Sequence, residues 1–311
     1  KQQANPDSDS GGPSQAKEPS PPSSASASKK KKKKQKTRES TTKRRAPRKT
    51  KSASSSSSAK SRALALASET VGEDVEGQQP ILDEKLMAKA LVHLSKNDPK
   101  LATVIRQIGP PTGLVPRLGV KAFRALCRSI VYQQLSTKSA AKIFGRLVDA
   151  CGGEAKLKPE ALMGLDLENA DGKKRLEIGL SRQKVKYLLS LAESFASGKL
   201  SDDRFRLLTD MEVMKQVTAI KGLGEWSVHM FMMFSLGRPD VLPVGDLAVR
   251  KAFKRLYGLE NDPTAQTVVE RLPERDEIIA IAKKWRPYRT IGSWYMWHVV
   301  ETKEAAYTFG A

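Results

Sequence analysis

The stretch VMKQVTAIKGLGEWSVHMFMMF, Val213–Phe234, decides how this chain is expected to fold. Apolar residues recur every three or four positions on both sides of a Gly-x-Gly turn at Gly222 and Gly224, which predicts two helices joined by a tight hairpin. Both glycines permit a positive φ and the close approach of another backbone. The second helix would point its free N–H groups and the positive end of its dipole towards a phosphate. An ordinary helix–helix turn remains the alternative interpretation.

An isolated aspartate follows this hairpin in LPVGDLAVRKAF, Leu242–Phe253. Asp246 stands after Pro243 and Gly245 and before a helical pattern, a position where aspartate is a preferred N-cap. A helix start also holds a carboxylate firmly, so capping and a chemical role are compatible here.

The rest of residues 80–311 predicts an all-α globule of roughly ten helices. Ser136, Ser181 and Asp210 are the predicted N-caps of three of them. Stretches of alternating polar and apolar residues, typical of strands, are absent, and Pro and Gly separate the helical stretches. The expected helices lie within 81–94, 120–135, 136–150, 181–196 and 210–220, on both sides of the hairpin, and after Asp246, Pro273 and Tyr288.

Basic residues dominate the chain, which has a formal net charge of +21 over 311 residues. Residues 1–70 hold 18 Lys/Arg against 5 Asp/Glu, and the remaining residues carry a further net charge of +8. This balance favours a polyanionic partner, most commonly nucleic acid, over a merely solvated basic surface. We predict that residues 1–80, rich in Ser, Pro and Lys, form a disordered tail and that residues 81–311 form the folded domain.

Two basic runs in this tail, Lys29–Lys34 and Lys43–Lys49, are typical of a nuclear-import signal or a non-specific DNA tether. We therefore expect a nuclear location, with plastid or mitochondrial targeting as the alternative. No apolar run approaches the length that spans a bilayer, so no membrane partner is expected. Cys127 and Cys151 do not form a CxxC pair, which argues against a disulfide framework and against a cysteine-based zinc or iron–sulfur site.

Five segments, in order along the chain, carry a resemblance to a known family: SIVYQQLSTKSAAKIFGRL (129–147), GLSRQKVKYLLSLAE (179–193), IKGLGEWSVHMF (220–231), PVGDLAVRKAF (243–253) and WRPYRTIGSWYMWH (285–298). Over about residues 80–305 the chain resembles the helix-hairpin-helix, Gly/Pro-Asp superfamily of DNA glycosylases, and most of all its alkyladenine branch, the 3-methyladenine DNA glycosylase II type. The resemblance implies two helical lobes with the active site in the cleft between them. A complete N-terminal β domain, as in bacterial relatives, does not fit after the predicted tail, and the [4Fe–4S] cysteine loop of other branches is absent.

The resemblance implies a monofunctional enzyme that flips an alkylated purine, of the 3-methyladenine or 7-methylguanine type, out of duplex DNA and hydrolyses its N-glycosidic bond. Asp246 would stabilise the oxocarbenium-like transition state and orient the attacking water. Bifunctional relatives carry a Schiff-base lysine two residues after the second hairpin glycine, where this chain has Trp226. Lys221 stands at the wrong offset for that role, so the expected product is an abasic site without strand cleavage.

The base pocket implied by the resemblance is formed by Trp226, Trp297 and Met230, the last where a bacterial relative has a pocket tyrosine. Indole faces attract cationic, electron-poor purines. Leu135, with Gln134 beside it, matches the residue that wedges into the gap left by the flipped nucleotide. For both tryptophans and for Leu135, a plain core position is the alternative.

Backbone groups of the hairpin also have roles by the resemblance. The carbonyl groups that would bind a Na+ or K+ ion, with no cofactor required for catalysis, are those of Thr218, Ile220 and Leu223. The amides that would contact a DNA phosphate are those of Gly222, Gly224 and Ser227. His229 and His298 are interpreted as structural.

The expected partner is double-stranded DNA that contains a damaged base, bound by a monomer. Two alternatives remain open. One is a non-catalytic, chromatin-associated DNA-binding protein built on the same scaffold, and the other is a glycosylase for another base such as hypoxanthine or uracil.

Overall fold

The structure is a computed structural model that describes residues 67–72, 82–115, 121–168, 172–259 and 271–301. Within these ranges it contains a helical turn at residues 67–70, the helices α2 to α14 and two 3-10 turns but no strand, which confirms the all-α prediction. The α-helices are α2 (Glu84–Asn97), α3 (Pro99–Ile108), α4 (Ala122–Tyr132), α5 (Thr137–Ala150), α6 (Pro159–Met163), α7 (Lys173–Ile178), α8 (Arg182–Ala196), α9 (Asp202–Leu207), α10 (Asp210–Thr218), α11 (Glu225–Phe234), α12 (Leu247–Tyr257), α13 (Arg275–Ala282) and α14 (Arg289–Glu301), and the 3-10 turns are η1 (Glu154–Lys156) and η2 (Lys283–Trp285). The described helices outnumber the expected ten because α6, α7 and α9 are too short to carry a periodic apolar signal.

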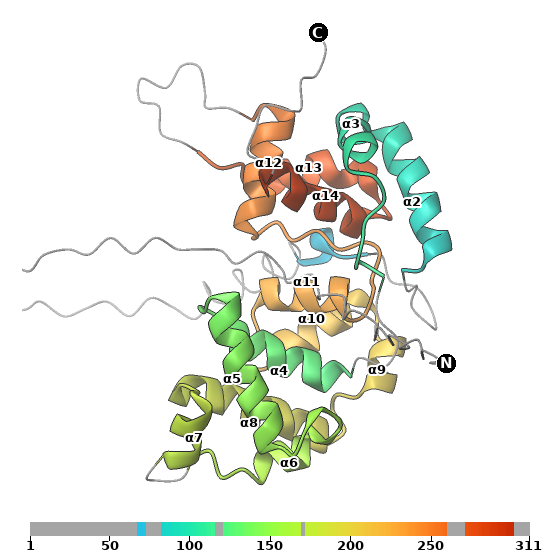
Figure 1. The fold of residues 1–311 in the computed structure, drawn as a ribbon. Helices are drawn as coiled ribbons and strands as arrows, with labels where there is room; N and C mark the ends of the chain where they lie inside the picture. The colour runs from blue at the N-terminus through green and yellow to red at the C-terminus, as the bar shows by residue number, and fades with distance from the viewer. Residues whose placement is uncertain (1–66, 73–81, 116–120, 169–171, 260–270, 302–311) are drawn as a thin grey trace, which may run out of the picture.

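The helices pack as two lobes (Figure 1). The upper lobe joins segments far apart in the sequence, since α14 packs against α12, α2 and α3. The lower lobe contains α4 to α11, and within it α8 packs against α4 and α6 while α11 packs against α10 and α4. Helix α11 lies on the side of the lower lobe that faces the upper lobe. Residues from both lobes can therefore meet beside α11.

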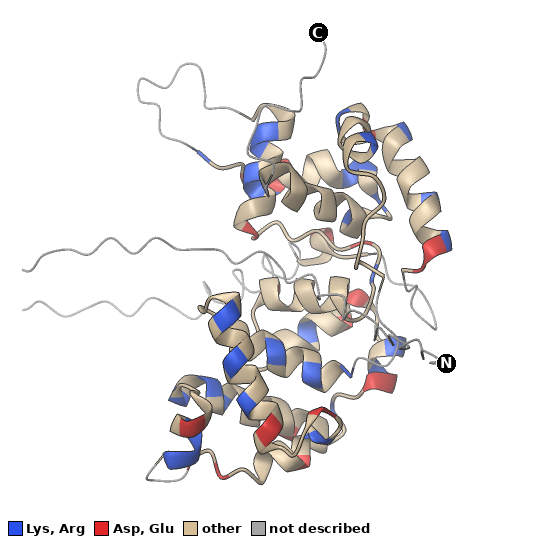
Figure 2. Ribbon diagram, viewed as in Figure 1, with Lys and Arg blue, Asp and Glu red and all other residues tan. Residues whose placement is uncertain are grey.

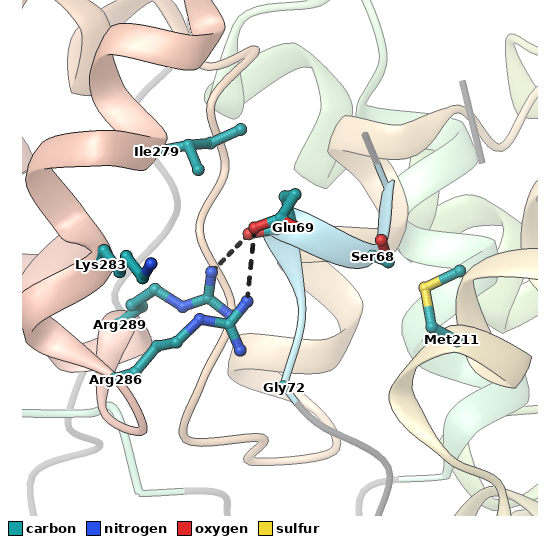
Figure 3. Close-up of a pocket in the computed structure, with 8 residues that line it drawn as sticks. All are labelled: Ser68, Glu69, Gly72, Met211, Ile279, Lys283, Arg286 and Arg289. Atoms are coloured by element: carbon teal, nitrogen blue, oxygen red, sulfur yellow. Dashed lines mark hydrogen bonds and ion pairs between the residues drawn. The ribbon is translucent and has the colours of Figure 1, made fainter. Parts of the chain in front are cut away.

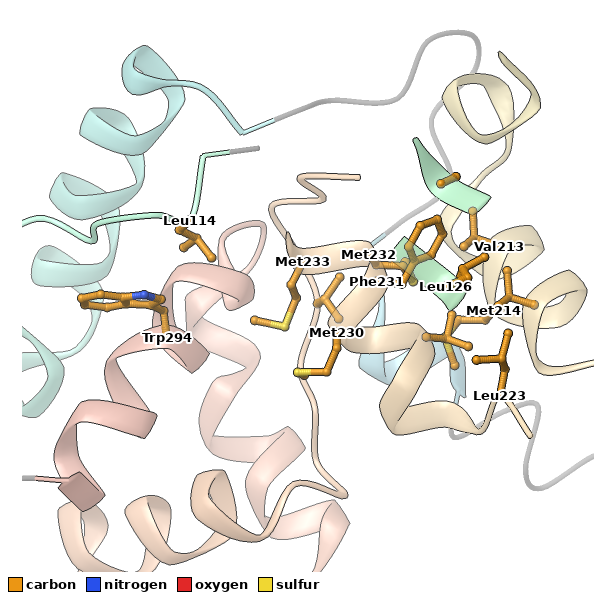
Figure 4. Close-up of a cluster of buried hydrophobic side chains, with 14 of the residues drawn as sticks. Leu114, Leu126, Val213, Met214, Leu223, Met230, Phe231, Met232, Met233 and Trp294 are labelled. Carbon is orange, nitrogen blue, oxygen red and sulfur yellow. The ribbon is translucent and has the colours of Figure 1, made fainter. Parts of the chain in front are cut away.

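Helix α11 is apolar around most of its circumference, which is the pattern of a helix buried on all sides. Its residues Met230, Phe231 and Met233 are all buried. Figure 4 shows Phe231 directed into the lower lobe beside Leu126, whereas Met230 and Met233 project towards the side where Trp294 of α14 lies. The same helix thus belongs to the core of the lower lobe and forms part of the surface that meets the upper one.

Three N-caps were predicted, and two are confirmed. Ser136 and Ser181 accept hydrogen bonds from the third residue of α5 and α8, respectively. The prediction for Asp210 is wrong, because Thr209 caps α10 in a capping box with Glu212. Asp210 is instead the first helical residue, and its buried carboxylate pairs with Arg238 Nε at 3.2 Å.

A short segment at residues 67–72, which we call the strap, lies against both lobes. The backbone carbonyls of Glu69 and Val71 accept hydrogen bonds from the guanidinium of Arg289, and the carbonyl of Thr70 accepts one from the amide of Leu242. Thr70 and Val71 are fully buried. The strap was predicted to belong to a disordered tail of residues 1–80, but its burial and its hydrogen bonds to Arg289 and Leu242 give it an ordered position that the local sequence does not reveal. Residues 1–66 and 73–80 of that tail lie outside the described residues.

Lysine and arginine residues lie on both lobes (Figure 2). On α5, Lys138, Lys142 and Arg146 are exposed and repeat every four residues, so they form one basic stripe along the helix. No helix among the described residues has both the length and the apolar composition that a membrane crossing requires.

Candidate active site

The hairpin between α10 and α11 has the expected shape, but its two glycines differ. Gly222 has a φ of +89°, and an added Cβ would lie 2.1 Å from the ring of Tyr187, so no other residue fits without rearrangement. Gly224 is extended (φ −85°, ψ 173°), and an added Cβ there would meet nothing within 4 Å. Gly222 therefore uses the positive φ that a glycine permits, whereas Gly224 does not. The space beside Gly224 is open to a ligand's approach.

Asp246 is the N-cap of α12. Its Oδ1 accepts hydrogen bonds from the amides of Ala248 and Val249, each at 2.9 Å. The carboxylate is therefore fixed in orientation by the start of a helix, as the sequence indicated.

Two tryptophans donate to the same carboxylate. Trp226 Nε1 on α11 donates to Asp246 Oδ2 at 2.7 Å, and Trp297 Nε1 on α14 donates to Asp246 Oδ1 at 3.1 Å. Oδ1 thus has three donors, whereas Oδ2 has one. Asp246 is only 7% exposed, but Trp226 directly against it is 37% exposed. The structure brings these three predicted residues together from both lobes, and Oδ2 retains a lone pair on the side of the exposed indole.

Aromatic and thioether side chains lie next to the two tryptophans that contact Asp246. Met230 is one helical turn after Trp226 on α11, so the two share a face of that helix, and Met230 is buried. Phe234, one turn further, stacks against Trp297 with a ring separation of 5.7 Å and a tilt of 30°. Trp297 and Met230 are thus buried, whereas Trp226 is exposed, and the pocket role of all three stays a prediction.

The predicted wedge residues lie in the turn between α4 and α5. Helix α4 ends at Tyr132, so Leu135 is not a helix-terminal core residue and is half-buried. Gln134 is exposed and has a φ of +57°, a left-handed conformation that non-glycine residues rarely adopt. The turn therefore presents Gln134 and Leu135 at the protein surface, directly before the basic stripe of α5.

The hairpin backbone offers both N–H donors, which suit an anion, and carbonyl oxygens, which suit a cation. The amides of Gly224 to Ser227 belong to the first turn of α11, where N–H groups have no partner within a helix, and both Gly224 and Lys221 are exposed. Thr218 is the last residue of α10, and the Ile220 carbonyl accepts the Leu223 amide at 3.1 Å while keeping a second lone pair. Carbonyl oxygens of this kind are hard ligands that suit an alkali cation, so the donor set fits a Na+ or K+ ion.

The two histidines expected to be structural have structural surroundings. His229 is buried, and its Nε2 lies 3.3 Å from the hydroxyl of Thr70 in the strap. Burial lowers the pKa of His229 to about 4. His298 stacks on Trp294 one turn before it. No group of three or more metal-binding side chains occurs among the described residues, and both cysteines are free thiols.

Three interactions near the site could not be anticipated from the sequence. Lys184 of α8 donates to two carbonyls at the end of α4, and Gln133 donates to the carbonyl of Gly222. Glu225 at the start of α11 pairs with Arg275 of the upper lobe. Lysines and glutamines are common on helices, so only the packing of distant elements identifies these as interactions that support the hairpin.

A cavity of about 450 Å³ lies beside the strap and contains none of the predicted site residues (Figure 3). Arg289 donates to the carbonyl of Glu69, and Arg286 lies 4.0 Å from its carboxylate. The charged groups here hold the strap in place. The lining residues are Ser68, Glu69, Gly72, Met211, Ile279, Lys283, Arg286 and Arg289.

Known proteins are similar to this chain in sequence and in fold. The family model described as HhH-GPD superfamily base excision DNA repair protein matches residues 127–275. The chain is similar to DNA-3-methyladenine glycosylase 1 of Schizosaccharomyces pombe, with 30% identity over 239 residues that cover 76% of this chain and 95% of the relative. Its fold is similar to that of a DNA-3-methyladenine glycosidase from Bacillus halodurans, with a TM-score of 0.57 and 33% identity over 68% of this chain and 89% of the other. It is also similar to the 3-methyladenine DNA glycosylase of Schizosaccharomyces pombe in complex with abasic DNA, with a TM-score of 0.55 and 28% identity over 67% of this chain and 95% of the other.

Proposed function

Because this chain belongs to the HhH-GPD superfamily of base excision DNA repair proteins, we propose that it is a DNA glycosylase that excises alkylated purines from duplex DNA by hydrolysis. The observation that supports this most is the carboxylate of Asp246, which is oriented by a helix start and flanked by indoles from the two lobes. The names of the similar proteins, glycosylases of 3-methyladenine, favour lesions of that type.

The chemistry assigned to Asp246 follows from its hydrogen bonds. Cleavage of the glycosidic bond develops positive charge at C1′, which a nearby carboxylate stabilises. Oδ1 is occupied by three donors, so Oδ2 faces the sugar or the attacking water. Trp226 keeps Oδ2 in place with a single hydrogen bond and leaves one lone pair for this task.

The absence of an amine at position 226 favours a monofunctional enzyme. Trp226 carries no nucleophilic amine, and its indole N–H already donates a hydrogen bond to Asp246. Lys221 is exposed on the hairpin, where it suits a phosphate contact. The product is then an abasic site in an unbroken strand.

The indoles provide recognition of the base. An alkylated purine with a positive charge is attracted to an indole face, and its glycosidic bond is already weakened, so no acid is needed to protonate the leaving group. Trp226 is exposed enough to take a stacking partner, whereas Met230 is a soft, adaptable surface one turn further along α11. This composition favours electron-poor purines over neutral bases.

Duplex DNA would lie across the lower lobe, bound by a monomer. The first turn of α11 supplies amides for one phosphate, and the basic stripe of α5 supplies charge for the flanking backbone. Gln134 and Leu135, which come directly before that stripe, would fill the space left by the everted nucleotide. A Na+ or K+ ion held by the carbonyls of the hairpin would stiffen it against the phosphate.

A panel of duplexes with one defined lesion each tests this function. The wild-type protein is expected to release 3-methyladenine and 7-methylguanine and to leave alkali-labile abasic sites, whereas Asp246→Asn should bind the same duplexes without releasing a base. Binding by the wild type without any abasic product would favour the non-catalytic DNA-binding protein. Release of hypoxanthine or uracil in preference to alkylated purines would overturn the assigned substrate class.

A further inference from the structure

Lys184 of α8 reaches across to the end of α4. Its Nζ donates to the carbonyl of Val131 at 2.7 Å and to the carbonyl of Gln133 at 2.9 Å. The last carbonyls of an α-helix have no partner within the helix, and an ammonium group is a suitable one. Lys184 therefore ties down the residue directly before Gln134.

The same turn is tied to the DNA-binding hairpin. Gln133 Nε2 donates to the carbonyl of Gly222 at 2.6 Å. The ring of Tyr187 packs against Gly222, so closely that an added Cβ would lie 2.1 Å from it. Lys184 and Tyr187 are three residues apart on α8 and share one face of that helix. A single edge of α8 thus supports both the wedge turn and the hairpin.

We propose that Lys184 is a positioning residue that holds the wedge turn, residues 133–135 between α4 and α5, at a fixed place relative to the hairpin. The hairpin can then bind a phosphate while Gln134 and Leu135 enter the duplex at the position of the everted nucleotide. This inference rests on the proposed function, since it assigns the means by which Gln134 and Leu135 are presented to DNA. The left-handed conformation of Gln134 is intrinsically unfavourable and persists only while its neighbours are held. The two hydrogen bonds from Lys184 supply that restraint.

The surroundings of Lys184 fit this role better than a role in binding phosphate. Burial lowers its pKa, and the hydrogen bonds of its ammonium go to backbone carbonyls. Lys186, two residues later on the same helix, is exposed and provides a matched control. Lys184→Met keeps the aliphatic stem and removes the donors, while Lys186→Met removes an exposed charge.

The test separates eversion of the base from its excision. Duplexes carry the lesion either in a normal pair or opposite an abasic site, where less pairing energy opposes eversion. Lys184→Met is expected to slow single-turnover release by about tenfold on the paired lesion and by much less on the unpaired one. Lys186→Met should match the wild type on both. Equal losses on the two duplexes, or no loss on either, would overturn the proposal.

A second measurement does not depend on catalysis. In an Asp246→Asn background, 2-aminopurine placed next to the lesion reports unstacking when the protein binds. Lys184→Met should reduce this fluorescence rise, and Gln133→Leu, which breaks the link to Gly222, should reduce it as well. If the wild type released no base but these fluorescence differences were present, the proposed function would be wrong and the positioning role would stand. Base release by the wild type, with the same fluorescence rise in all variants, would overturn the positioning role and leave the proposed function intact. Thermal unfolding of each variant confirms that the chain is folded.

Discussion

Two buried aspartates on the connection between α11 and α12 have opposite surroundings. Asp240 is 5% exposed and Asp246 is 7% exposed. The carboxylate of Asp240 accepts hydrogen bonds from Nε of Arg289 at 2.7 Å and from a terminal nitrogen of the same guanidinium at 2.9 Å. The carboxylate of Asp246 accepts hydrogen bonds from two backbone amides and from two indole N–H groups. Among the described residues, no cationic side chain pairs with Asp246.

This difference is the one expected between a carboxylate that holds the fold together and one that takes part in the proposed reaction. The charge of Asp240 is neutralised by Arg289, which also binds the carbonyls of the strap, so the pair links three segments of chain. The charge of Asp246 is oriented by neutral donors but is not cancelled by a neighbour. Such a carboxylate stabilises a transient cation without having to release a partner first.

The largest expected effect concerns the rate of excision. Asp246→Asn should slow single-turnover base release by about a thousandfold, or ~4 kcal/mol, because the amide carries no charge to oppose the oxocarbenium ion. Asparagine caps helices about as well as aspartate, so the melting temperature should remain near that of the wild type. A large fall in the melting temperature would mean that Asp246 is structural in the same sense as Asp240.

A substitution at Asp240 is expected to lower stability rather than the rate of excision. Asp240→Asn leaves the guanidinium of Arg289 buried with a weakened partner, which should lower the free energy of unfolding by about 3–5 kcal/mol. Urea denaturation measures this loss, and base release per folded molecule should change little. An Asp240 variant that is stable but inactive would remove the distinction between the two aspartates.

The strap region should also respond to pH through His229, which lies beside Thr70. Burial lowers the pKa of this imidazole to about 4, with a smaller opposing contribution from Glu225 and further lowering by Arg275 and Arg289. An unfolded histidine has a pKa of about 6.5, so between these values the unfolded chain binds a proton that the native protein does not. The free energy of unfolding should therefore fall as the pH drops from about 6.5 to 4, by about 3 kcal/mol in total.

The measurement is the difference in pH dependence between the wild type and His229→Gln. Carboxylates titrate in both proteins below about pH 5 and cancel in the comparison. The variant should lose stability less steeply over the window in which the histidine titrates. Parallel curves would show that His229 accepts a proton in the native state without penalty.

Substitutions of the two hairpin glycines are expected to have smaller effects on stability, and the two glycines can be compared with each other. Gly222→Ala should cost about 1–3 kcal/mol of stability, because it combines a positive φ with a Cβ that meets Tyr187. Gly224→Ala should leave the melting temperature nearly unchanged, because a Cβ there meets nothing in the protein. If a phosphate approaches Gly224, this variant should instead bind duplex DNA more weakly in a titration. Equal affinity of the Gly224 variant and the wild type would place the phosphate elsewhere.

Much of this architecture could be predicted because its signals are local. The helices around Asp246 and the hairpin, and the caps Ser136 and Ser181, follow from apolar spacing and capping preference. Thr209 was missed although Thr209 and Glu212 have the spacing of a capping box, because Asp210 beside it is also a preferred N-cap residue. The short helices carry no period, so they could not be found in this way.

The residues of the candidate site could be named from the sequence, but the hydrogen bonds between them could not. Asp246 and the two tryptophans were identified by family resemblance, whereas the hydrogen bonds that join them depend on the packing of α14 against α12. The strap was missed for a related reason. Thr70 and Val71 belong to a Ser- and Ala-rich stretch with few large apolar groups, and their burial is determined by Arg289, more than two hundred residues away.

The smallest effect concerns the charged residues that precede the strap. Residues 1–66 contain 18 Lys/Arg and 4 Asp/Glu, so their deletion should flatten the dependence of DNA affinity on salt while base release at saturating protein is retained. Deletion of residues 1–72 removes the strap as well. It should also lower stability, because Arg289 loses two carbonyl acceptors and the buried side chain of Val71 leaves a cavity. The two deletions differ by only six residues, so unfolding and salt titrations on both separate the contribution of charge from that of packing. If the shorter deletion destabilised the protein as much as the longer one, the strap would not be the element that links the lobes.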